Sequence, residues 1–167
     1  SLGRKCSTHI YDVSKKTNID KMVDEFLEFH GNIDVLVNNA IMQPQNKPFF
    51  EIDEEWWDYM MDLSLKGYFF AAQKASKEMI ERKTAGSIIC ISSVHSYRAA
   101  EDWTPYGIAK IGTRRMVKGL AADLANTGIN ANCIAPGWIN NTIPENDQVE
   151  PESMPAPLGL VQDNAAC

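Results

Sequence analysis

Two short runs of nearly continuous apolar residues constrain the fold more than any other feature of the sequence. They are IDVLVN at residues 33–38 and GSIICIS at residues 86–92. Each is too short for a typical helix and lacks the polar–apolar alternation of a strand with one solvated face. Such runs are typical of parallel strands covered on both faces of a sheet. We therefore expect both runs to be strands of a parallel sheet.

The neighbouring segments predict that strands alternate with helices. Residues 5–13 and 129–135 are β-like in composition and are two further strand candidates. Residues 18–30 place apolar side chains at helical spacing, and Gly31 follows as a C-terminal stop. Alternation of this kind predicts an α/β fold with a parallel sheet.

Two longer helices are predicted from their starting signals. Asp53 has the side chain of an N-cap and is followed by two acidic residues, so we expect a helix from there towards Arg82. Thr104 is the expected cap of the next helix, with Pro105 at the first helical position, where its missing N–H costs nothing. Both helices are expected to lie side by side on the sheet.

The composition indicates one globular domain, residues 1–167, and argues against several classes of partner. Of the 167 residues, 44% are hydrophobic and 23% are charged, which is enough apolar chain to bury a core. A net charge of −6 and a pI near 5.0 argue against a nucleic-acid partner, which requires a basic stripe. No apolar run approaches the length of a membrane span, so no membrane partner is expected. The four cysteines have no metal-ligand spacing, and we expect no metal site and a reducing, cytoplasmic compartment.

Polar and turn-forming residues follow three of the predicted strands. The strand that ends at residue 92 is followed by Ser93, the strand before it by Asn39 and Ala40, and the strand after it by Pro136 and Gly137. In open α/β sheets, ligands bind in the crevice outside these carboxyl ends. Each feature alone is ordinary turn chemistry, but together they predict a site at this edge of the sheet.

The stretch YGIAK places Tyr106 and Lys110 one helical turn apart, on the helix that follows the strand ending near Ser93. A Tyr-xxx-Lys pair is a weak motif by itself, because such pairs also arise by chance. Its position at the predicted crevice favours proton chemistry over an ordinary pair of helix residues.

Together these features resemble the short-chain dehydrogenase/reductase family, the single-domain NAD(P)-dependent kind. The resemblance extends from about Cys6 to the last residue, and Ser93 lies thirteen residues before Tyr106, the usual gap in that family. The motifs that carry it are Asp12-Val13, Asn38-Asn39-Ala40, MDLSLKG at residues 61–67, Ser92-Ser93, Tyr106-xxx-Lys110, Pro136-Gly137 and Pro157-Leu158-Gly159.

The resemblance implies a Rossmann-like, doubly wound parallel sheet that is incomplete in this sequence. The family begins with a strand and a Gly-rich turn that have no counterpart here, so the first βαβ unit is expected to be absent. The sequence also stops inside the helix expected after Pro157-Leu158-Gly159, before the last strand. Residues 5–13 would be the third strand of the family and would lack a neighbour. On these grounds we expect the sequence to be a fragment of a longer protein.

The resemblance also implies roles for the site residues. Tyr106 would be the general acid in reduction and the base in oxidation, Lys110 would lower its pKa and hold the cofactor ribose, and Ser93 would bind the substrate oxygen. The cofactor would be NAD or NADP, which carries the hydride. Cofactor contacts are implied for Asp12, Val13, Asn38, Ala40, Tyr106, Lys110, Pro136, Gly137, Ile139 and Thr142.

Three positions depart from the family pattern. Ser64 stands where the family has a catalytic asparagine that binds a water of the proton relay, and Ile41 stands where it has a glycine. Asn141 takes the usual place of a threonine, and Thr142 is next to it. Since a serine can still hold a water molecule, Ser64 is the fourth catalytic candidate.

The expected substrate is a small alcohol or carbonyl compound. The segment SSVHS at residues 92–96 resembles the corresponding segment of sugar and polyol dehydrogenases of the family. This resemblance favours a sugar, a polyol or a small keto compound as the substrate. His95, Trp103 and Trp138 are candidate substrate contacts, and residues 140–157, polar and rich in proline, are expected to form a flexible substrate loop. For His95, an ordinary loop histidine with satisfied hydrogen bonds is an equal alternative.

Two classes of function and one assembly remain open. An active oxidoreductase is favoured by the intact Ser93, Tyr106 and Lys110, whereas Ser64 and Ile41 motivate a catalytically weak relative that serves as a binding or regulatory subunit. The resemblance further implies a homodimer or homotetramer in which the two long helices pair across a two-fold axis. The side chains expected at that interface are Trp57, Met61, Tyr68, Ala72, Met79, Gly112, Met116, Gly119 and Leu120.

Overall fold

The structure, a computed structural model, describes residues 5–42, 44–137, 139 and 161–163. Four strands form one sheet in the order β1-β2-β3-β4, where β1 is Val35–Asn38, β2 is Gly86–Ile91, β3 is Ile129–Ala135 and β4 is Val161–Asp163. The pairs β1–β2 and β2–β3 are parallel, as predicted, with Asn38 opposite Cys90 and Cys90 opposite Cys133.

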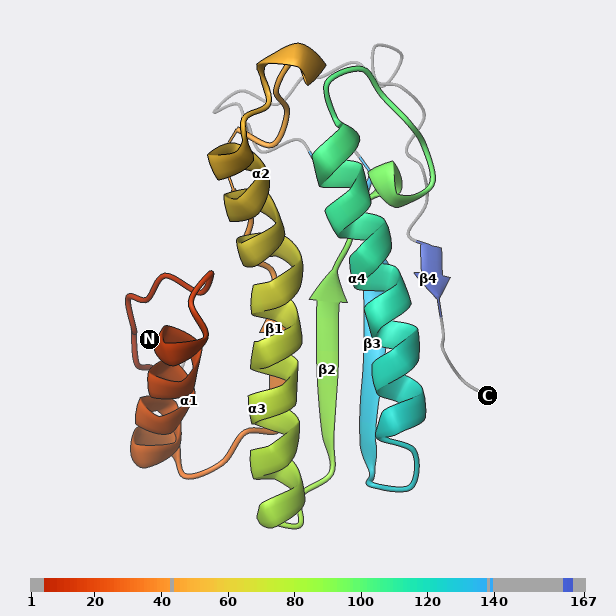
Figure 1. Ribbon diagram of the computed structural model, residues 1–167. Coiled ribbons are helices and arrows are strands. Elements are labelled where there is room, and N and C mark those ends of the chain that lie inside the picture. Colours follow the sequence, from red (N-terminus) through yellow and green to blue (C-terminus); the bar gives the residue numbers. More distant parts are fainter. Residues whose placement is uncertain (1–4, 43, 138, 140–160, 164–167) are drawn as a thin grey trace, which may run out of the picture.

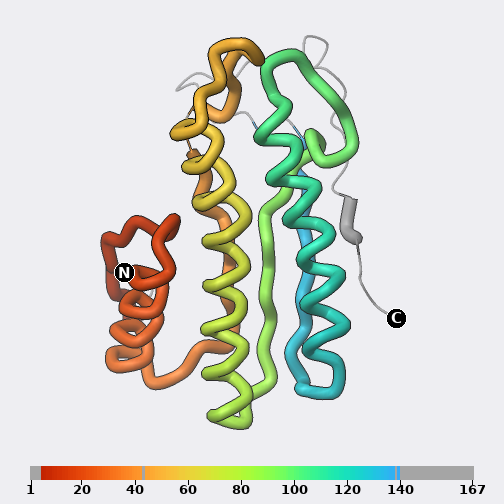
Figure 2. The backbone as a smooth tube through the Cα atoms, viewed as in Figure 1, coloured from red at the N-terminus to blue at the C-terminus, as the bar shows by residue number. Residues whose placement is uncertain are grey.

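The unit that contains α3 and the helix α4 lie over one face of this sheet, and α1 lies beside α3, beyond the β1 edge (Figures 1 and 2). On the other side, Val35 and Val37 of β1 are each 54% exposed, so the expected cover on both faces is not seen within the described residues. The helices are α1 (Lys16–His30), α2 (Glu54–Met61), α3 (Gly67–Glu81) and α4 (Thr104–Asp123), with short helical turns at η1 (Phe49–Glu51) and η3 (Val94–Ser96). Across the described ranges, no helix is both long and apolar enough to cross a bilayer.

A π-helical turn, η2 (Asp62–Lys66), joins α2 to α3 and makes the predicted long helix one continuous unit. Tyr68, Ala72 and Met79 lie on the same face of this unit as the buried Met60 and Ser64, at three- and four-residue spacings. They point into the core, with at most 2% exposed, and the prediction that they form an interface is wrong.

Local signals set the helix ends. The Asp53 carboxylate accepts the Trp56 N–H at 2.7 Å, and Gly31 closes α1 in the left-handed region with φ of 84°, so both predicted caps are confirmed. The Thr104 cap is wrong by one residue. Trp103 occupies the N-cap position, because its carbonyl accepts the first helical bond, from the Gly107 N–H at 2.8 Å.

Residues 5–13 do not form the predicted strand. A strand needs a neighbour for its backbone hydrogen bonds, and none of the described strands pairs with this segment. Side chains hold it to α1 instead: Tyr11 and His9 bond the Glu25 carboxylate at 2.5 and 2.9 Å, and Ser7 bonds His30 at 3.0 Å.

The end of the described chain also differs from expectation. A helix was expected after residue 159, but β4 pairs with β3 in the antiparallel direction, with Gln162 opposite Ile134. The physical reason is that β3 has an open edge on that side, and an open edge offers unpaired N–H and C=O groups.

The core has two parts. The main cluster fills the space between the sheet and the helices and includes Tyr68, Met79, Ile88 and Val117. A smaller cluster lies at the carboxyl end of the sheet and contains Met42, Met60, Leu63, Tyr106 and Ala109. The ring of Tyr106 is therefore packed among apolar side chains, although the residue carries a polar hydroxyl.

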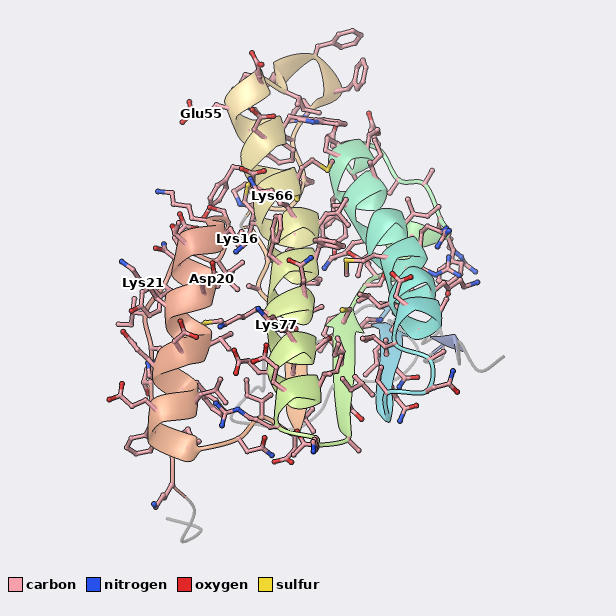
Figure 3. All side chains as sticks on the ribbon, turned by 60° about the horizontal axis from the view of Figure 1, so that its bottom comes forward. Lys16, Asp20, Lys21, Glu55, Lys66 and Lys77 are labelled. Atoms are coloured by element: carbon pink, nitrogen blue, oxygen red, sulfur yellow. The ribbon has the colours of Figure 1, made fainter. Side chains whose placement is uncertain are left out.

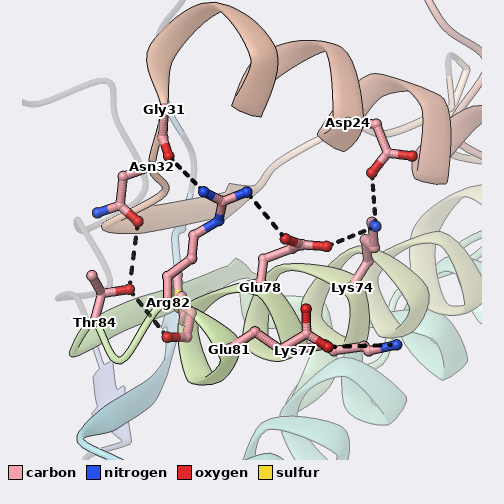
Figure 4. A network of polar contacts seen from close by, with 10 residues as sticks. Asp24, Gly31, Asn32, Lys74, Lys77, Glu78, Glu81, Arg82 and Thr84 are labelled. Carbon is pink, nitrogen blue, oxygen red and sulfur yellow. Dashed lines mark hydrogen bonds and ion pairs between the residues drawn. The ribbon is translucent and has the colours of Figure 1, made fainter.

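Ion pairs connect α1 to α3 on the outside. Lys74 of α3 lies between Asp24 of α1 and Glu78, at 2.7 and 2.8 Å, and Glu78 also pairs with Arg82 (Figure 4). Other charges lie along the helix surfaces, among them the pair Lys16–Asp20 at 2.6 Å (Figure 3).

Candidate active site

The carboxyl end of β2 is tied to its neighbours by hydrogen bonds. Ser92 Oγ donates to the Lys110 carbonyl of α4 at 2.8 Å, and the Val94 N–H donates to the Pro136 carbonyl after β3 at 3.0 Å. These bonds fix Ser93, which lies between Ser92 and Val94, against the first turns of α4, where Tyr106 and Lys110 lie. The predicted trio is thus brought together.

Lys110 is a buried cation. Its side chain is 2% exposed, and Nζ donates to the Ile91 carbonyl at 2.7 Å. The ammonium also lies 5.2 Å from the Tyr68 ring centroid and 5.6 Å from that of Tyr106. No carboxylate pairs with it among the residues that the structure describes. Because burial penalises the charged form, the pKa of Lys110 falls to about 8.

Tyr106 is 8% exposed and lies beside Ser93 and Lys110. Burial raises the pKa of its phenol, and a hydrogen bond with the Ser93 side chain lowers it, with burial the larger effect. The family resemblance predicts a lowered pKa, which the groups within the described part of the chain do not produce by themselves. The phenol of Tyr106 is therefore protonated at neutral pH and is poised as an acid.

Ser93 is held by its surroundings on both sides. Its Oγ accepts the His95 N–H at 3.2 Å, and its carbonyl accepts the Ser96 hydroxyl at 2.6 Å. With a lone pair occupied by the His95 N–H, the hydroxyl has its proton and one further lone pair for Tyr106 and a ligand.

Two aromatic side chains lie against Tyr106. His95 and Trp103 stack with centroids 4.3 Å apart and an interplanar angle of 9°, and both meet the Tyr106 ring edge-on, at 5.6 and 5.2 Å. His95 Nδ1 is buried and has no hydrogen-bond partner among the described residues. Burial lowers the pKa of His95, so its ring is neutral at pH 7. Two of the three predicted substrate contacts therefore adjoin Tyr106, while Trp138 lies outside the described residues.

The predicted cofactor contacts after β1 and β3 lie at the same edge of the sheet. Asn38 is buried, and its amide donates to the Tyr68 carbonyl at 3.1 Å and to Cys90 Sγ at 3.5 Å. Ala40 is exposed just beyond it. Pro136 and Gly137 are half-buried, and Ile139 is 63% exposed. Thr142 and the predicted loop at residues 140–157 lie outside the described residues.

Asp12 and Val13 lie just before α1. The Asp12 carboxylate accepts the Ser14 N–H at 3.0 Å and its hydroxyl at 2.6 Å, and these bonds lower the pKa of Asp12. The Val13 carbonyl approaches Gly67 so closely that a Cβ there would lie 2.5 Å from the oxygen. The glycine of the MDLSLKG motif therefore admits the chain that carries both predicted contacts.

Ser64, the fourth catalytic candidate, is fully buried in η2. Its hydroxyl donates to Met60 Sδ at 3.5 Å, and its carbonyl accepts the Thr113 hydroxyl at 3.3 Å. These contacts are all with packing residues of α2 and α4.

Sequence reasoning missed Tyr68, whose hydroxyl lies 3.5 Å from Lys110 Nζ. The available signal was its position one turn after Ser64, which puts it near the catalytic candidate of the same helix.

Comparison with known proteins gives a family and several relatives. Residues 1–156 match the model of a family described as enoyl-(acyl carrier protein) reductase. The (2S)-[(R)-hydroxy(phenyl)methyl]succinyl-CoA dehydrogenase subunit BbsD of Thauera aromatica is 35% identical over 150 residues, covering 87% of this chain and 59% of the relative. The 2-dehydro-3-deoxy-D-gluconate 5-dehydrogenase of Escherichia coli K12 is 34% identical over 144 residues, covering 85% and 56%.

A solved structure gives the same result. The gluconate 5-dehydrogenase of Burkholderia cenocepacia J2315, in complex with NADP and tartrate, is similar with a TM-score of 0.71 and 38% identity over 77% of this chain and 49% of that one. The chain spans about half the length of the relatives that it matches. The parallel sheet, the positions of the motifs and the match to the family model all indicate the same family. The chain belongs to the short-chain dehydrogenase/reductase family.

Proposed function

We propose that the protein is an NAD(P)-dependent oxidoreductase that interconverts a secondary alcohol and a carbonyl compound. The observation that carries the proposal is the buried ammonium of Lys110 beside Tyr106, with no carboxylate partner in the part of the chain that the structure describes. A buried charge without a counter-charge costs stability, and perturbed groups of this kind gather at functional sites.

Each residue of the trio has a role that its surroundings support. In reduction, Tyr106 gives its proton to the carbonyl oxygen, and its raised pKa keeps that proton available at neutral pH. Ser93 presents its hydroxyl to the same oxygen, because the His95 N–H fixes its Oγ. Lys110 remains an ammonium below about pH 8 and stabilises negative charge on Tyr106 when the proton leaves.

The donor set fits a nicotinamide cofactor. Lys110 has three N–H donors, and the Ile91 carbonyl and the Tyr68 hydroxyl accept two of them, which leaves one for a ribose hydroxyl. Ala40 and Gly137 follow β1 and β3 at the same edge and offer backbone without bulky side chains. When bound, the cofactor supplies the hydride exchange with the substrate carbon.

A sugar acid, polyol or small keto compound is the substrate class that we propose. The stacked His95–Trp103 pair offers an apolar face next to Tyr106, and stacked aromatic faces suit the C–H side of a sugar ring. Two of the relatives named above act on gluconate derivatives, whereas the Thauera relative is named for an aromatic succinyl-CoA. The proposed substrate class is therefore tested with sugar acids and with aromatic keto compounds.

The test is nicotinamide binding and turnover of the full-length protein. We expect NADH or NADPH to bind in calorimetry and to be oxidised with members of a panel of keto-sugar acids and small ketones. Lys110→Ala is expected to weaken nicotinamide binding by about tenfold or more, because it removes a charged hydrogen bond. No nicotinamide binding by the wild-type protein would refute the proposal.

A catalytically weak binding or regulatory subunit is the second candidate. It is favoured by Ser64, whose hydroxyl is turned to Met60, and by the Tyr106 phenol, whose pKa is raised by burial. This candidate predicts tight nicotinamide binding with no turnover on any member of the panel, and no further loss in Tyr106→Phe.

We also propose a homodimer or homotetramer through the outer faces of α3 and α4. A groove between η2, α3 and α4 is lined by apolar and small residues together with Lys66, Arg115 and Asp123, and Phe69 at its side is 41% exposed. Phe69 is exposed, unlike the buried Tyr68 and Met79, so a second copy of the chain would cover apolar surface there. Light scattering of a stable monomer at micromolar concentration would contradict this assembly. The groove residues that support it are Met61, Leu65, Phe69, Gly112, Met116 and Gly119.

A further inference from the structure

The phenol of Tyr68 is enclosed in the core next to the site. The residue is 2% exposed, although the phenylalanines that follow it, Phe69 and Phe70, are more exposed. A buried hydroxyl without a partner costs about 1–3 kcal/mol, so a tyrosine at such a position needs a bonding partner. Its oxygen has such a partner in Lys110 Nζ at 3.5 Å, a long contact, and the ring centroid lies 5.2 Å from the same ammonium.

The position of Tyr68 is fixed from the other side as well. The Asn38 amide at the end of β1 donates to the Tyr68 carbonyl at 3.1 Å, which anchors this turn of α3 to the sheet edge. A rigidly held phenol can in turn hold a flexible lysine, because the ring has few rotamers and its oxygen is at a defined place.

Ser64 cannot give Lys110 the same support in this chain. It is fully buried, and its hydroxyl is directed at Met60 Sδ. The position that the family resemblance assigns to a relay residue is thus engaged in packing, whereas Tyr68, one turn further along the chain, reaches the ammonium.

We propose that Tyr68 is a positioning residue for the reaction, and that its phenol oxygen holds the Lys110 ammonium beside Tyr106. Ser64 makes no such contact with the ammonium. This inference rests on the proposed oxidoreductase function. The titratable groups around the ammonium are Tyr106 on α4, Tyr68 on α3, Cys90 on β2 and Cys133 on β3.

Removal of the phenol oxygen has a defined electrostatic consequence. Burial lowers the pKa of Lys110 to about 8, and a hydrogen bond to the ammonium favours the charged form, so we expect the loss of this contact in Tyr68→Phe to lower the pKa of Lys110 further. The ring and its packing remain. With a decrease of about one pKa unit, the charged fraction of Lys110 falls about fivefold at pH 8 and changes little at pH 6.

The experiment measures the pH dependence of kcat and the titration of Lys110 in the full-length enzyme. In Tyr68→Phe we expect the alkaline limb of the kcat profile to move about one pH unit lower, with about fivefold less activity at pH 8 and near wild-type activity at pH 6. Tyr59→Phe is the matched control, because it removes a phenol that is 44% exposed on α2, and its profile is expected to stay in place. If Tyr68 served only in packing, Tyr68→Phe would lower the stability of the protein without moving the alkaline limb of its kcat profile.

The titration of Lys110 by NMR of ¹³C-labelled lysine, assigned with Lys110→Met, is independent of activity. We expect its midpoint to move lower by the same amount in Tyr68→Phe as the alkaline limb does. An unmoved Lys110 titration in Tyr68→Phe overturns the proposal, as does a kcat profile equal to that of Tyr59→Phe. A wild-type protein without turnover would refute the proposed function, and the NMR titration would still decide the contact between Tyr68 and Lys110.

Discussion

Lys74 and Lys110 lie on adjacent helices over the same sheet, yet their electrostatic surroundings are opposite. Lys74 has carboxylates of Asp24 and Glu78 within 2.8 Å, and these hydrogen bonds raise its pKa above the ordinary value (Figure 4). Lys110 has a carbonyl, a phenol and two aromatic faces, and burial lowers its pKa to about 8.

The contrast separates two uses of a charged side chain. The charge of Lys74 is compensated, and it joins α1 to α3, so it contributes to stability. The charge of Lys110 is not compensated by any described carboxylate, so it lowers stability where it lies. A fold retains such a residue at a place where the charge acts on a ligand or a proton.

The largest expected effect is on the Lys110 side, in Tyr106→Phe. Phenylalanine keeps the ring that packs with His95 and Trp103 but lacks the proton that the reaction needs. Turnover is expected to fall by about 10³-fold or more, with the nicotinamide Kd and the melting temperature nearly unchanged. Tyr97→Phe, which alters a phenol that is 46% exposed, is the control and should keep its turnover. Near-normal turnover of Tyr106→Phe would show that another group donates the proton.

The two lysines predict opposite dependences of stability on pH. Between the native pKa of Lys110, about 8, and its ordinary value of 10.5, the unfolded state binds more protons than the native state, so its contribution to stability rises with pH. For Lys74, whose native pKa is raised, the contribution is present below 10.5 and is lost as the pH rises through the native pKa.

Urea unfolding of the wild-type protein and of Lys110→Met at pH 8 and at pH 10 measures this difference. The stability of the wild type relative to Lys110→Met is expected to increase by about 2 kcal/mol between the two pH values. A difference that is constant with pH would mean that the ammonium of Lys110 has a counter-charge in the native protein.

A smaller effect is expected on the Lys74 side, in Glu78→Gln. The Glu78 side chain is 13% exposed and pairs with Lys74 at 2.8 Å and with Arg82 at 3.5 Å. Loss of its charge is expected to lower the free energy of unfolding by about 1 kcal/mol and to leave turnover unchanged. In the control Glu81→Gln, which weakens an exposed 3.7 Å pair with Lys77, urea unfolding should change by less than about 0.5 kcal/mol. Equal losses of unfolding free energy in the two variants would show that the Lys74 network stabilises the protein no more than an exposed ion pair does.

The smallest effect is expected in Ser64→Ala. The hydroxyl bonds only a thioether sulfur in the described contacts, so turnover should stay within about threefold and stability within about 1 kcal/mol of the wild type. Steady-state kinetics at pH 7 checks this. A tenfold loss of turnover would instead support the relay role that the family resemblance assigns to Ser64.

Local chemistry made much of the fold predictable. The strands at residues 86–91 and 129–135, the Asp53 cap and the Gly31 stop depend on residues close in sequence, and the structure has all of them. Segments whose state depends on a distant neighbour were not predictable in the same way. Residues 5–13 have strand composition without a partner strand, and β4 forms because β3 offers a free edge.

The site shows the same division. The spacing of Ser93, Tyr106 and Lys110 follows from motif and helix geometry, and the structure brings them together. The contact of Tyr68 with Lys110 joins α3 to α4, and the stacking of His95 on Trp103 joins η3 to the start of α4. Sequence spacing alone does not give these contacts, because each depends on how two elements pack against each other.

The most direct test compares Lys110→Met with Lys74→Met, each measured for turnover and for the free energy of unfolding at pH 7. If the charge of Lys110 serves the reaction, Lys110→Met loses turnover by about 10²-fold or more and is as stable as the wild type or more stable. Lys74→Met then keeps its turnover within about twofold and loses about 1 kcal/mol of stability. Near wild-type turnover in Lys110→Met, or a stability loss there as large as that of Lys74→Met, would contradict the division of roles between the two lysines.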